Sequence, residues 1–296
     1  MDINYELYKV FYHVASTLSF SEASKQLFIS QSAVSQSIKT LERKLDQTLF
    51  IRSTKHVQLT PEGEIRHIEP AMHFIRRGEA QLLDAAATGG QIRIGASDTI
   101  CRYFLVPYLE RFHRDFPSAH IKVINQTSIK CVELLETGQV DLIVTNYPNQ
   151  YLSNVSSIKK IRTFKDVFIA NKSFEQLKGQ KLSYEQLSKY PILMLDKRST
   201  TSEFLHRLFQ QHHLDLVPEI ELTSNDLLID LARIGLGIAF IPDFCIQEPN
   251  DDLFIVETEE ELPTRELVIA HNEQIPLTKA SEEFLNYFED CGTERS

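Results

Sequence analysis

Two stripes of apolar residues with helical spacing dominate the first 45 residues of this 296-residue chain. The first recurs at i, i+3, i+4, i+7, i+8 and i+11, as on one face of a helix, and consists of Leu7, Val10, Phe11, Val14, Ala15 and Leu18. The second has a similar period and consists of Val34, Ile38, Leu41 and Leu45. Between them, Ser21 can cap a short helix that carries Ala23 and Leu27. Residues 28–30 then form a tight turn, and Ser30 can cap a third helix that runs to about Leu45. The pattern predicts a helix-turn-helix unit.

The polar face of the third expected helix has no acidic residue before Glu42. Its members are Gln31, Ser32, Ser35, Gln36, Lys39 and Arg43. Amides and hydroxyls can donate to and accept from base edges, and cations suit phosphates, so this face is typical of a helix that enters the DNA major groove. The alternative is an ordinary solvated helix face. Residues 49–52 and 57–59 are then expected to form the two strands of a small wing, with Arg52, Lys55 and His56 near its tip.

The charge of the chain is unevenly divided. Residues 1–60 hold 7 Lys or Arg and 5 Asp or Glu, a net charge of +2, whereas the whole chain carries −10. Residues 61–88 carry −2, and residues 89–296 carry −10. This asymmetry suggests a short module that faces a polyanion, attached to a larger body with another task.

Several protein classes are not expected from the sequence. The sequence contains no run of about 18 apolar residues, so no membrane helix is predicted. The first ten residues lack the basic and apolar regions of a secretory signal. No CxxC pair occurs among the four cysteines Cys101, Cys131, Cys245 and Cys291. Neither a zinc site nor a disulfide framework is therefore predicted, and the expectation is a cytoplasmic protein whose cysteines are small buried hydrophobes.

Thr60 and Pro61 form a strong helix start signal, a capping residue followed by proline at the first helical position. A loose apolar stripe follows and consists of Ile65, Ile68, Met72, Ile75 and Leu82. Pro70 is expected to kink this helix and Gly78 to weaken it, and residues 88–90 end it. An apolar stripe on a long helix outside any domain needs a partner, so the linker predicts at least a dimer.

From residue 91 onward, expected strands and helices alternate. The strands are expected near residues 91–96, 120–125, 141–144, 167–170, 192–195, 219–222 and 238–242. This alternation predicts an α/β architecture with largely parallel sheets. The helices that follow begin repeatedly with small hydroxyl or amide residues, namely Ser97, Ser128, Thr200, Ser224 and Asn225.

These helix starts predict a small-molecule site. In open α/β sheets ligands bind beyond the carboxyl ends of the strands, where the free N–H groups of helix N-termini favour anions. The alternative is that each residue only caps its own helix, and Thr200 with Glu203 fits a capping box. Arg198, beside the Ser-Thr cluster, can receive a carboxylate or can be an ordinary surface residue. A small organic anion is the resulting hypothesis.

The segment FYHVAS…QLTPEG, residues 11–63, resembles the N-terminal domain of LysR-type transcriptional regulators. The matching positions are Phe11, Val14, Ala15, Ser19, Phe20, Ala23, Leu27, Ser30, Gln31, Ala33, Val34, Ser35, Ile38, Leu41, Glu42, Leu45, Leu49, Phe50, Arg52, Leu59, Thr60 and Gly63. Leu18 and Asp46 stand where that family usually has Gly, and Ser32 where it often has Pro.

By this resemblance the third helix lies in the major groove and the wing follows the flanking DNA. The resemblance implies base-facing roles for Gln31, Ser32, Ser35 and Gln36. It implies phosphate-facing roles for Lys39, Arg52 and Lys55, and a capping and backbone-contact role for Ser30. The implied partners are double-stranded promoter DNA, further copies of the chain in a homodimer or homotetramer, and RNA polymerase.

The segments IRIGASDT, GQVDLIVT and ARIGLGIAFIP resemble the effector-binding domain of the same family, a two-lobed α/β fold similar to type 2 periplasmic solute-binding proteins. The resemblance implies an effector between the lobes that touches Ser97, Thr99, Thr145, Ser199, Thr200, Thr201 and Gly237, with Arg198 beside it. The predicted organisation is a winged helix-turn-helix at 1–60, a linker helix at 61–88 and an effector domain at 89–296. Lobe I is expected at about 91–163 and 266–296, and lobe II at about 164–265.

Two other functions compete with that of a regulator. An enzyme has little support, because Ser157-x-x-Lys160 is a lone match and His206, His212 and His213 have no clear carboxylate partner in the sequence. No P-loop or nucleophile elbow occurs, so no catalytic residue, metal ligand or cofactor is predicted. A free solute-binding protein conflicts with residues 1–60 and with the absence of a signal sequence. The prediction is therefore a ligand-responsive, DNA-binding transcription regulator.

Overall fold

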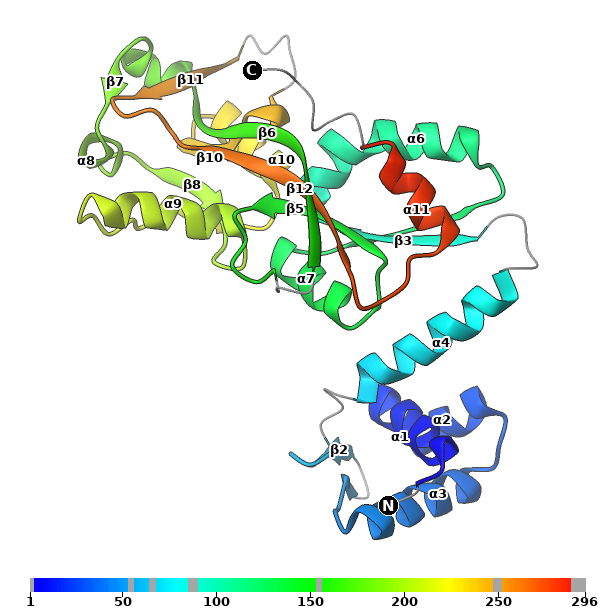
Figure 1. The fold of residues 1–296 in the computed structure, drawn as a ribbon. Helices are drawn as coiled ribbons and strands as arrows, with labels where there is room; N and C mark the ends of the chain where they lie inside the picture. Colours follow the sequence, from blue (N-terminus) through cyan, green and yellow to red (C-terminus); the bar gives the residue numbers. More distant parts are fainter. Residues whose placement is uncertain are drawn as a thin grey trace. The chain divides into compact units, whose positions relative to one another are not determined.

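The computed structural model describes residues 3–52, 56–63, 68–84, 90–152, 156–246 and 252–288. Figure 1 shows the helices and strands of its two units, Met1–Leu83 and Asp84–Ser296. In the described part of the chain, no helix is long and apolar enough to cross a membrane.

The first unit is built from three helices and a hairpin. The helices are α1 (Tyr5–Thr17), α2 (Phe20–Leu27) and α3 (Gln31–Leu45), and the antiparallel hairpin consists of β1 (Phe50–Arg52) and β2 (Val57–Leu59). Their shared core consists of Val10, Phe11, Val14, Ala15, Phe20, Ala23, Val34, Ile38, Leu41, Leu49 and Phe50. The predicted helix-turn-helix with its wing is confirmed.

The ends of these helices correct two details of the prediction. Ser19, not Ser21, caps α2, because its hydroxyl accepts from the backbone N–H of Glu22. Leu18 does not extend the apolar face of α1. It is the left-handed cap residue with a φ of 49° and is 47% exposed. Ser30 caps α3 as predicted, and Asp46 ends α3 with a left-handed φ of 53°.

The linker helix differs from the prediction at its start. Residues 61–63 form a turn, in which the Thr60 hydroxyl accepts from Gly63 N–H at 3.0 Å and donates to the Thr48 carbonyl at 2.6 Å. Within the described residues, α4 (Ile68–Asp84) begins only at Ile68. Residues 68–84, which include Pro70, are helical throughout, and the kink expected at Pro70 stays a prediction.

Helix α4 is attached to the helix-turn-helix by polar and apolar contacts. Met72 is 2% exposed. The Arg76 guanidinium lies 4.9 Å from the Tyr12 ring centre and bonds to His13 Nε2 at 2.8 Å, while His13 Nδ1 bonds to the side-chain carbonyl of Gln26 on α2. Of the predicted linker stripe, Ile75 is 39% exposed, and Ile65 and the side chain of Leu82 lie outside the described residues.

The second unit has two lobes joined by two long strands. Lobe I contains β3 (Gln91–Ala96), β4 (His120–Asn125) and β5 (Leu142–Tyr147); lobe II contains β8 (Ile192–Leu195), β9 (Ile220–Leu222) and β10 (Ile238–Pro242). The connecting strands are β6 (Ser156–Asn171) and β12 (Thr264–Asn272), and the order is β4-β3-β5-β12-β6-β10-β8-β9. β11 (Leu253–Thr258) pairs with β6 and with β7 (Lys181–Leu182).

The prediction of largely parallel sheets holds for the three outer strands of each lobe. β3 is parallel to β4 and β5, and β8 is parallel to β9 and β10. The crossing strands are antiparallel to their neighbours: β12 pairs with β5 and β6, and β6 pairs with β10. The two-lobed α/β fold is thus confirmed, with antiparallel strands at its centre.

Helices cover both lobes (Figure 1). Those of lobe I are α5 (Asp98–Ile100), a π-helical turn (Cys101–Leu105), α6 (Val106–Asp115), α7 (Ser128–Glu136) and α11 (Lys279–Asn286). Those of lobe II are α8 (Tyr184–Leu187), α9 (Thr200–Gln211), α10 (Asn225–Arg233) and two 3-10 turns (Lys172–Leu177 and Asp243–Cys245). Lobe I has its core around Phe112, Phe284 and Phe288, and lobe II around Phe168, Phe209 and Phe240.

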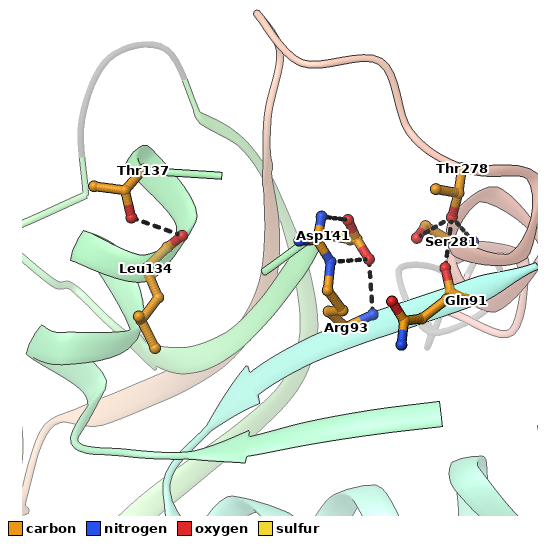
Figure 2. Close-up of polar contacts among 7 residues, drawn as sticks. All are labelled: Gln91, Arg93, Leu134, Thr137, Asp141, Thr278 and Ser281. Atoms are coloured by element: carbon orange, nitrogen blue, oxygen red, sulfur yellow. Dashed lines mark hydrogen bonds and ion pairs between the residues drawn. The ribbon is translucent and has the colours of Figure 1, made fainter. Parts of the chain in front are cut away.

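A buried ion pair anchors the start of the lobe I sheet, as Figure 2 shows. Arg93 of β3 contacts Asp141 through Nη2 at 2.7 Å and Nε at 3.3 Å, and its backbone N–H donates to the same carboxylate. Asp141 precedes β5, so this contact fixes the alignment of the two parallel strands. Nearby, the Thr278 hydroxyl caps α11 and donates to the Gln91 carbonyl. The GQVDLIVT motif therefore has a structural reason for its Asp.

Candidate DNA-facing surface and effector cavity

The predicted DNA-facing side chains lie on the outer face of α3. Gln31, Ser32, Gln36 and Lys39 are exposed and Ser35 is partly exposed, opposite the buried Val34, Ile38 and Leu41. The Ser30 hydroxyl accepts from Ala33 N–H at 3.1 Å and bonds to the Ser32 hydroxyl at 2.8 Å. The first turn of α3 contains no acid, so its N-terminal partial positive charge is not offset there.

Two predicted contacts fall outside this description. Arg52 ends β1, but its side chain is not among those described, and Lys55 lies outside the described residues. The sequence analysis did not predict the exposure of Phe28, which lies in the turn before α3. Phe28 has a left-handed φ of 55° and is 95% exposed. An apolar residue inside a predicted tight turn was the available signal.

A cavity of about 220 Å³ lies between the lobes of the second unit. It is lined from lobe I by the starts of α5 and α7 and the end of β5, and from lobe II by the starts of α9 and α10. The lining residues are Ser97, Asp98, Thr99, Ile100, Asn125, Gln126, Thr127, Ser128, Asn146, Leu195, Asp196, Ser199, Thr200, Thr201, Thr223, Asn225, Pro242 and Phe244. Strand ends and helix starts thus converge where the sequence predicted a site.

The helix caps are only partly those predicted. Ser97 and Ser224 cap their own helices. Thr127 caps α7 in place of Ser128, and Ser199 caps α9 in place of Thr200. The capping box of Thr200 with Glu203 is therefore wrong.

The predicted effector residues divide into two groups. Ser97, Thr99, Ser199, Thr200 and Thr201 line the cavity. Three others do not line it: Thr145, Arg198 and Gly237.

Each of the three has another structural setting. Thr145 is fully buried, and its hydroxyl accepts from the Asn149 amide at 3.1 Å. Arg198 donates to Asp196 at 2.6 Å and is largely exposed, so the geometry gives no support to it as a carboxylate receptor. At Gly237 an added Cβ would lie 2.4 Å from the Pro191 carbonyl oxygen, which explains a glycine there by close backbone approach.

The electrostatics of the cavity depend on backbone rather than on cationic side chains. None of the described residues that line it is Lys, Arg or His, and two are acids, Asp98 and Asp196. Asp98 accepts from the Asn125 amide at 3.0 Å, and Asp196 is paired with Arg198. The groups at the cavity that favour a negative charge are the backbone N–H groups at the N-termini of α7, α9 and α10.

Hydrogen bonds at the cavity join one lobe to the other. The Asn146 amide donates to the Thr200 hydroxyl at 3.2 Å, and the Asn225 amide donates to the Thr99 hydroxyl at 2.8 Å. Sequence reasoning missed Asn146, although a polar residue at the end of the apolar strand LIVTNY was a signal.

Two tyrosines make further bonds between the lobes. The Tyr103 hydroxyl donates to Asp226, and the Tyr151 hydroxyl donates to Glu203 at 2.8 Å. Burial, and next the hydrogen bond to Asp226, raise the pKa of Tyr103.

The residues considered for catalysis form no active site. Lys160 lies on β6, bonded to Glu266 at 2.8 Å, and this hydrogen bond raises its pKa, so it is no base for Ser157. His212 and His213 lie beyond α9, and His212 has a carboxylate partner after all, Glu260 at 3.3 Å. Over the described residues no cluster of His, Cys, Asp and Glu could hold a metal ion.

Two family models match the chain and together span most of it. The model "LysR substrate binding domain" matches residues 85–291, and "Bacterial regulatory helix-turn-helix protein, lysR family" matches residues 5–64. The chain belongs to the LysR family. It is a ligand-responsive DNA-binding transcription regulator and not an enzyme, as the sequence predicted.

Curated relatives of this LysR family member are regulators of similar length. A "Probable RuBisCO transcriptional regulator" of Phaeodactylum tricornutum is 27% identical over 92% of each chain. The "HTH-type transcriptional activator IlvY" of Salmonella typhimurium is 24% identical over 86% of this chain and 89% of its own. The "HTH-type transcriptional regulator AlsR" of Bacillus subtilis is 27% identical over 88% and 87%.

Solved structures share the fold. Full-length CbnR complexed with target DNA matches 98% of this chain and all of its own with a TM-score of 0.68 at 16% identity. A full-length OxyR variant from Pseudomonas aeruginosa matches 100% and 99% with a TM-score of 0.72 at 18% identity. The regulatory domain of Synechocystis CcmR in complex with 2-PG matches 69% of this chain and 98% of its own with a TM-score of 0.62 at 20% identity.

Proposed function

We propose that this LysR family member binds promoter DNA through residues 1–60 and senses a small organic anion in the cavity of residues 89–296, in the cytoplasm. The observation that carries the proposal is the pairing, in one chain, of an exposed acid-free face on α3 with a hydroxyl- and amide-lined cavity between two lobes. Residues 61–88 then act as the linker between the two functions.

On the DNA side, base-facing roles fall to Gln31, Ser32, Ser35 and Gln36. Phosphate-facing roles fall to Lys39, Arg52 and Lys55, with Ser30 as cap and backbone contact. The exposure of the described members supports this division, as does the family likeness to CbnR, whose structure was solved with its target DNA.

On the effector side, Ser97, Thr99, Ser199, Thr200 and Thr201 are the proposed contacts, because they line the cavity. The N–H groups of the α7, α9 and α10 N-termini supply the attraction for an anion. The likeness to the CcmR regulatory domain, solved with 2-PG, is consistent with a small ligand at such a cavity.

The signal passes between these sites by a population shift. A ligand that contacts both lobes favours the closed arrangement by its differential affinity, and the packing of subunits in a dimer or tetramer changes with it. Residues 1–60 carry only +2, so tight binding requires two or more DNA-reading heads acting together. A contact with RNA polymerase is the proposed route from the bound regulator to transcription.

Two substitutions on α3 test the DNA contacts. Lys39→Ala removes a phosphate contact, so it weakens binding to all sequences about equally and lowers the slope of log affinity against log salt by about one unit. Gln31→Ala instead changes which operators are preferred. Binding titrations at several salt concentrations, on a set of operator variants, measure both effects. If Lys39→Ala changes the preference and leaves the salt slope intact, the assignment is wrong.

A further inference from the structure

Two side-chain amides at the effector cavity are each only half paired. Asn146 is 8% exposed and Asn225 is 3% exposed, and each donates through Nδ2 to a threonine hydroxyl. The Oδ1 atom of each is buried and has no hydrogen-bond partner within the described part of the chain. A buried acceptor left unpaired is costly, so both oxygens call for a donor.

The two amides lie at the cavity in opposite lobes, in a reciprocal arrangement. Asn146 ends β5 in lobe I and donates to Thr200 of α9 in lobe II. Asn225 begins α10 in lobe II and donates to Thr99 of α5 in lobe I. Both side chains line the same cavity. A ligand that donates to both free oxygens therefore contacts both lobes at once.

The rest of the cavity lining favours a ligand group that accepts hydrogen bonds, not one that donates them. The N-termini of α7, α9 and α10 present backbone N–H groups, which favour a negative group. A bare carboxylate satisfies these donors but leaves the amide oxygens of Asn146 and Asn225 unpaired. A neutral polyol pairs with the amides but leaves the helix N-termini without an anion.

We propose, on the basis of the proposed function, that the effector is a small carboxylate that also carries a hydroxyl or ammonium group. An ammonium group can donate to both Asn146 Oδ1 and Asn225 Oδ1, and a hydroxyl group donates to one of them. The cavity of about 220 Å³ is smaller than the ~300–1,000 Å³ of typical drug-sized pockets, which sets the scale of the ligand. Asp98 at the cavity edge disfavours a ligand that carries only negative charge.

Matched compounds test this class on the full chain. Isothermal titration compares succinate with malate and aspartate, which add one hydroxyl or one ammonium, and propionate with lactate and alanine. Glycerol serves as the neutral polyol. The expected result is that at least one donor-bearing carboxylate binds about tenfold or more tightly than its bare counterpart, because each new hydrogen bond fills an unpaired buried acceptor.

Substitutions then locate the donor-reading groups. Asn146→Leu and Asn225→Leu each remove a free oxygen and are expected to reduce the preference to about threefold or less. Asn125→Leu is the matched control, because it lines the same cavity but its amide is paired with Asp98; there the preference persists. If the leucine variants do not fold, Asn225→Asp keeps the size and an acceptor while adding charge, and it increases the preference for the ammonium member of each series.

Three results would overturn the proposal: equal or tighter binding of the bare carboxylates, binding of glycerol without any carboxylate, or no binding of any compound at 10 mM, roughly the weak limit for a specific small ligand. Each leaves the proposed function standing if the same preparation still protects operator DNA. Loss of DNA binding by the intact chain would instead contradict the proposed function itself.

Discussion

Replacement of Arg265 by methionine is expected to destabilise the second unit more severely than any exposed charge change. Arg265 is 2% exposed, and its guanidinium donates to Asp166 at 2.7 Å and to Thr201 at 3.2 Å. It also lies 5.3 Å from the Phe164 ring and 4.8 Å from the Phe204 ring. The residue thus ties both crossing strands, β12 and β6, to the first turn of α9 beside the cavity.

The magnitude follows from what Arg265→Met leaves behind. Asp166 is fully buried, and removal of one partner of a buried ion pair costs about 3–5 kcal/mol. For a unit of this size each kcal/mol lowers Tm by about 2–4 °C, so a loss of about 6–20 °C is expected. The matched control Arg198→Met removes an exposed arginine from a pair of similar length and is expected to lower Tm far less, because solvent screens that pair.

The loss of stability in Arg265→Met is expected to depend on pH through the ionisation of Asp166. Burial raises the pKa of Asp166, Arg265 opposes that rise, and Asp243 adds to it. Without Arg265 the pKa of Asp166 in the folded state lies further above its unfolded value, so the folded variant binds the proton on Asp166 more tightly. Stability is then retained below the unfolded pKa and lost as pH rises through the folded pKa. The Tm deficit of Arg265→Met is therefore larger at pH 8 than at pH 5.

Differential scanning calorimetry of the full chain at both pH values measures these effects. In the double variant Asp166→Asn/Arg265→Met no charge remains buried at this pair, so most of the deficit and its pH dependence are expected to disappear. A loss of Tm in Arg265→Met no larger than that in Arg198→Met, or a double variant as unstable as the single one, would show that the buried pair does not have this role.

Two further predictions concern backbone strain and thiol reactivity. Leu18 and Asp46 have left-handed φ values of 49° and 53°, so Leu18→Gly and Asp46→Gly should each stabilise the first unit against urea by about 0.5–1 kcal/mol. Thr17→Gly, at the last residue of α1, should destabilise it by a similar amount. If neither glycine variant gains stability, these two φ values are not strained. Burial raises the pKa of Cys101 to about 11 and that of Cys131 to about 12, and it also raises the pKa of Cys245. In a Cys291→Ser chain these thiols should resist iodoacetamide at pH 7.5 under conditions that label free cysteine fully, and rapid labelling would show that they are more accessible than the structure indicates.

The elements that the sequence predicted best are those with strong periodicity and clear ends. Examples are the apolar stripe of α3, its Ser30 cap and the alternation of strands and helices from residue 91. All of them depend on local residue patterns, and the structure contains each of them. Cap positions were less predictable, because Ser19 and Ser21, or Ser199 and Thr200, are chemically equivalent neighbours and only the backbone path decides between them.

The features that the sequence did not reveal depend on contacts far along the chain. β12 and the full length of β6 form because they pair with each other and with both lobes, and their residues show no separate signal. At the cavity, Asn146 becomes important only because β5 ends opposite α9, 54 residues later. Thr145 and Gly237, in contrast, lie in motifs that resemble the family but have buried structural settings here.

The proposed function couples an effector cavity to a DNA-reading face within one chain. Footprinting on DNA upstream of its own gene and the divergent neighbouring gene, with and without the carboxylate that binds most tightly, tests it most directly. The expected result is a protected region that spans at least two half-sites about one or more helical turns apart. Its extent, or the affinity for it, changes with the ligand. Absence of protection at low salt, or protection that no cavity ligand alters, would contradict the proposed function.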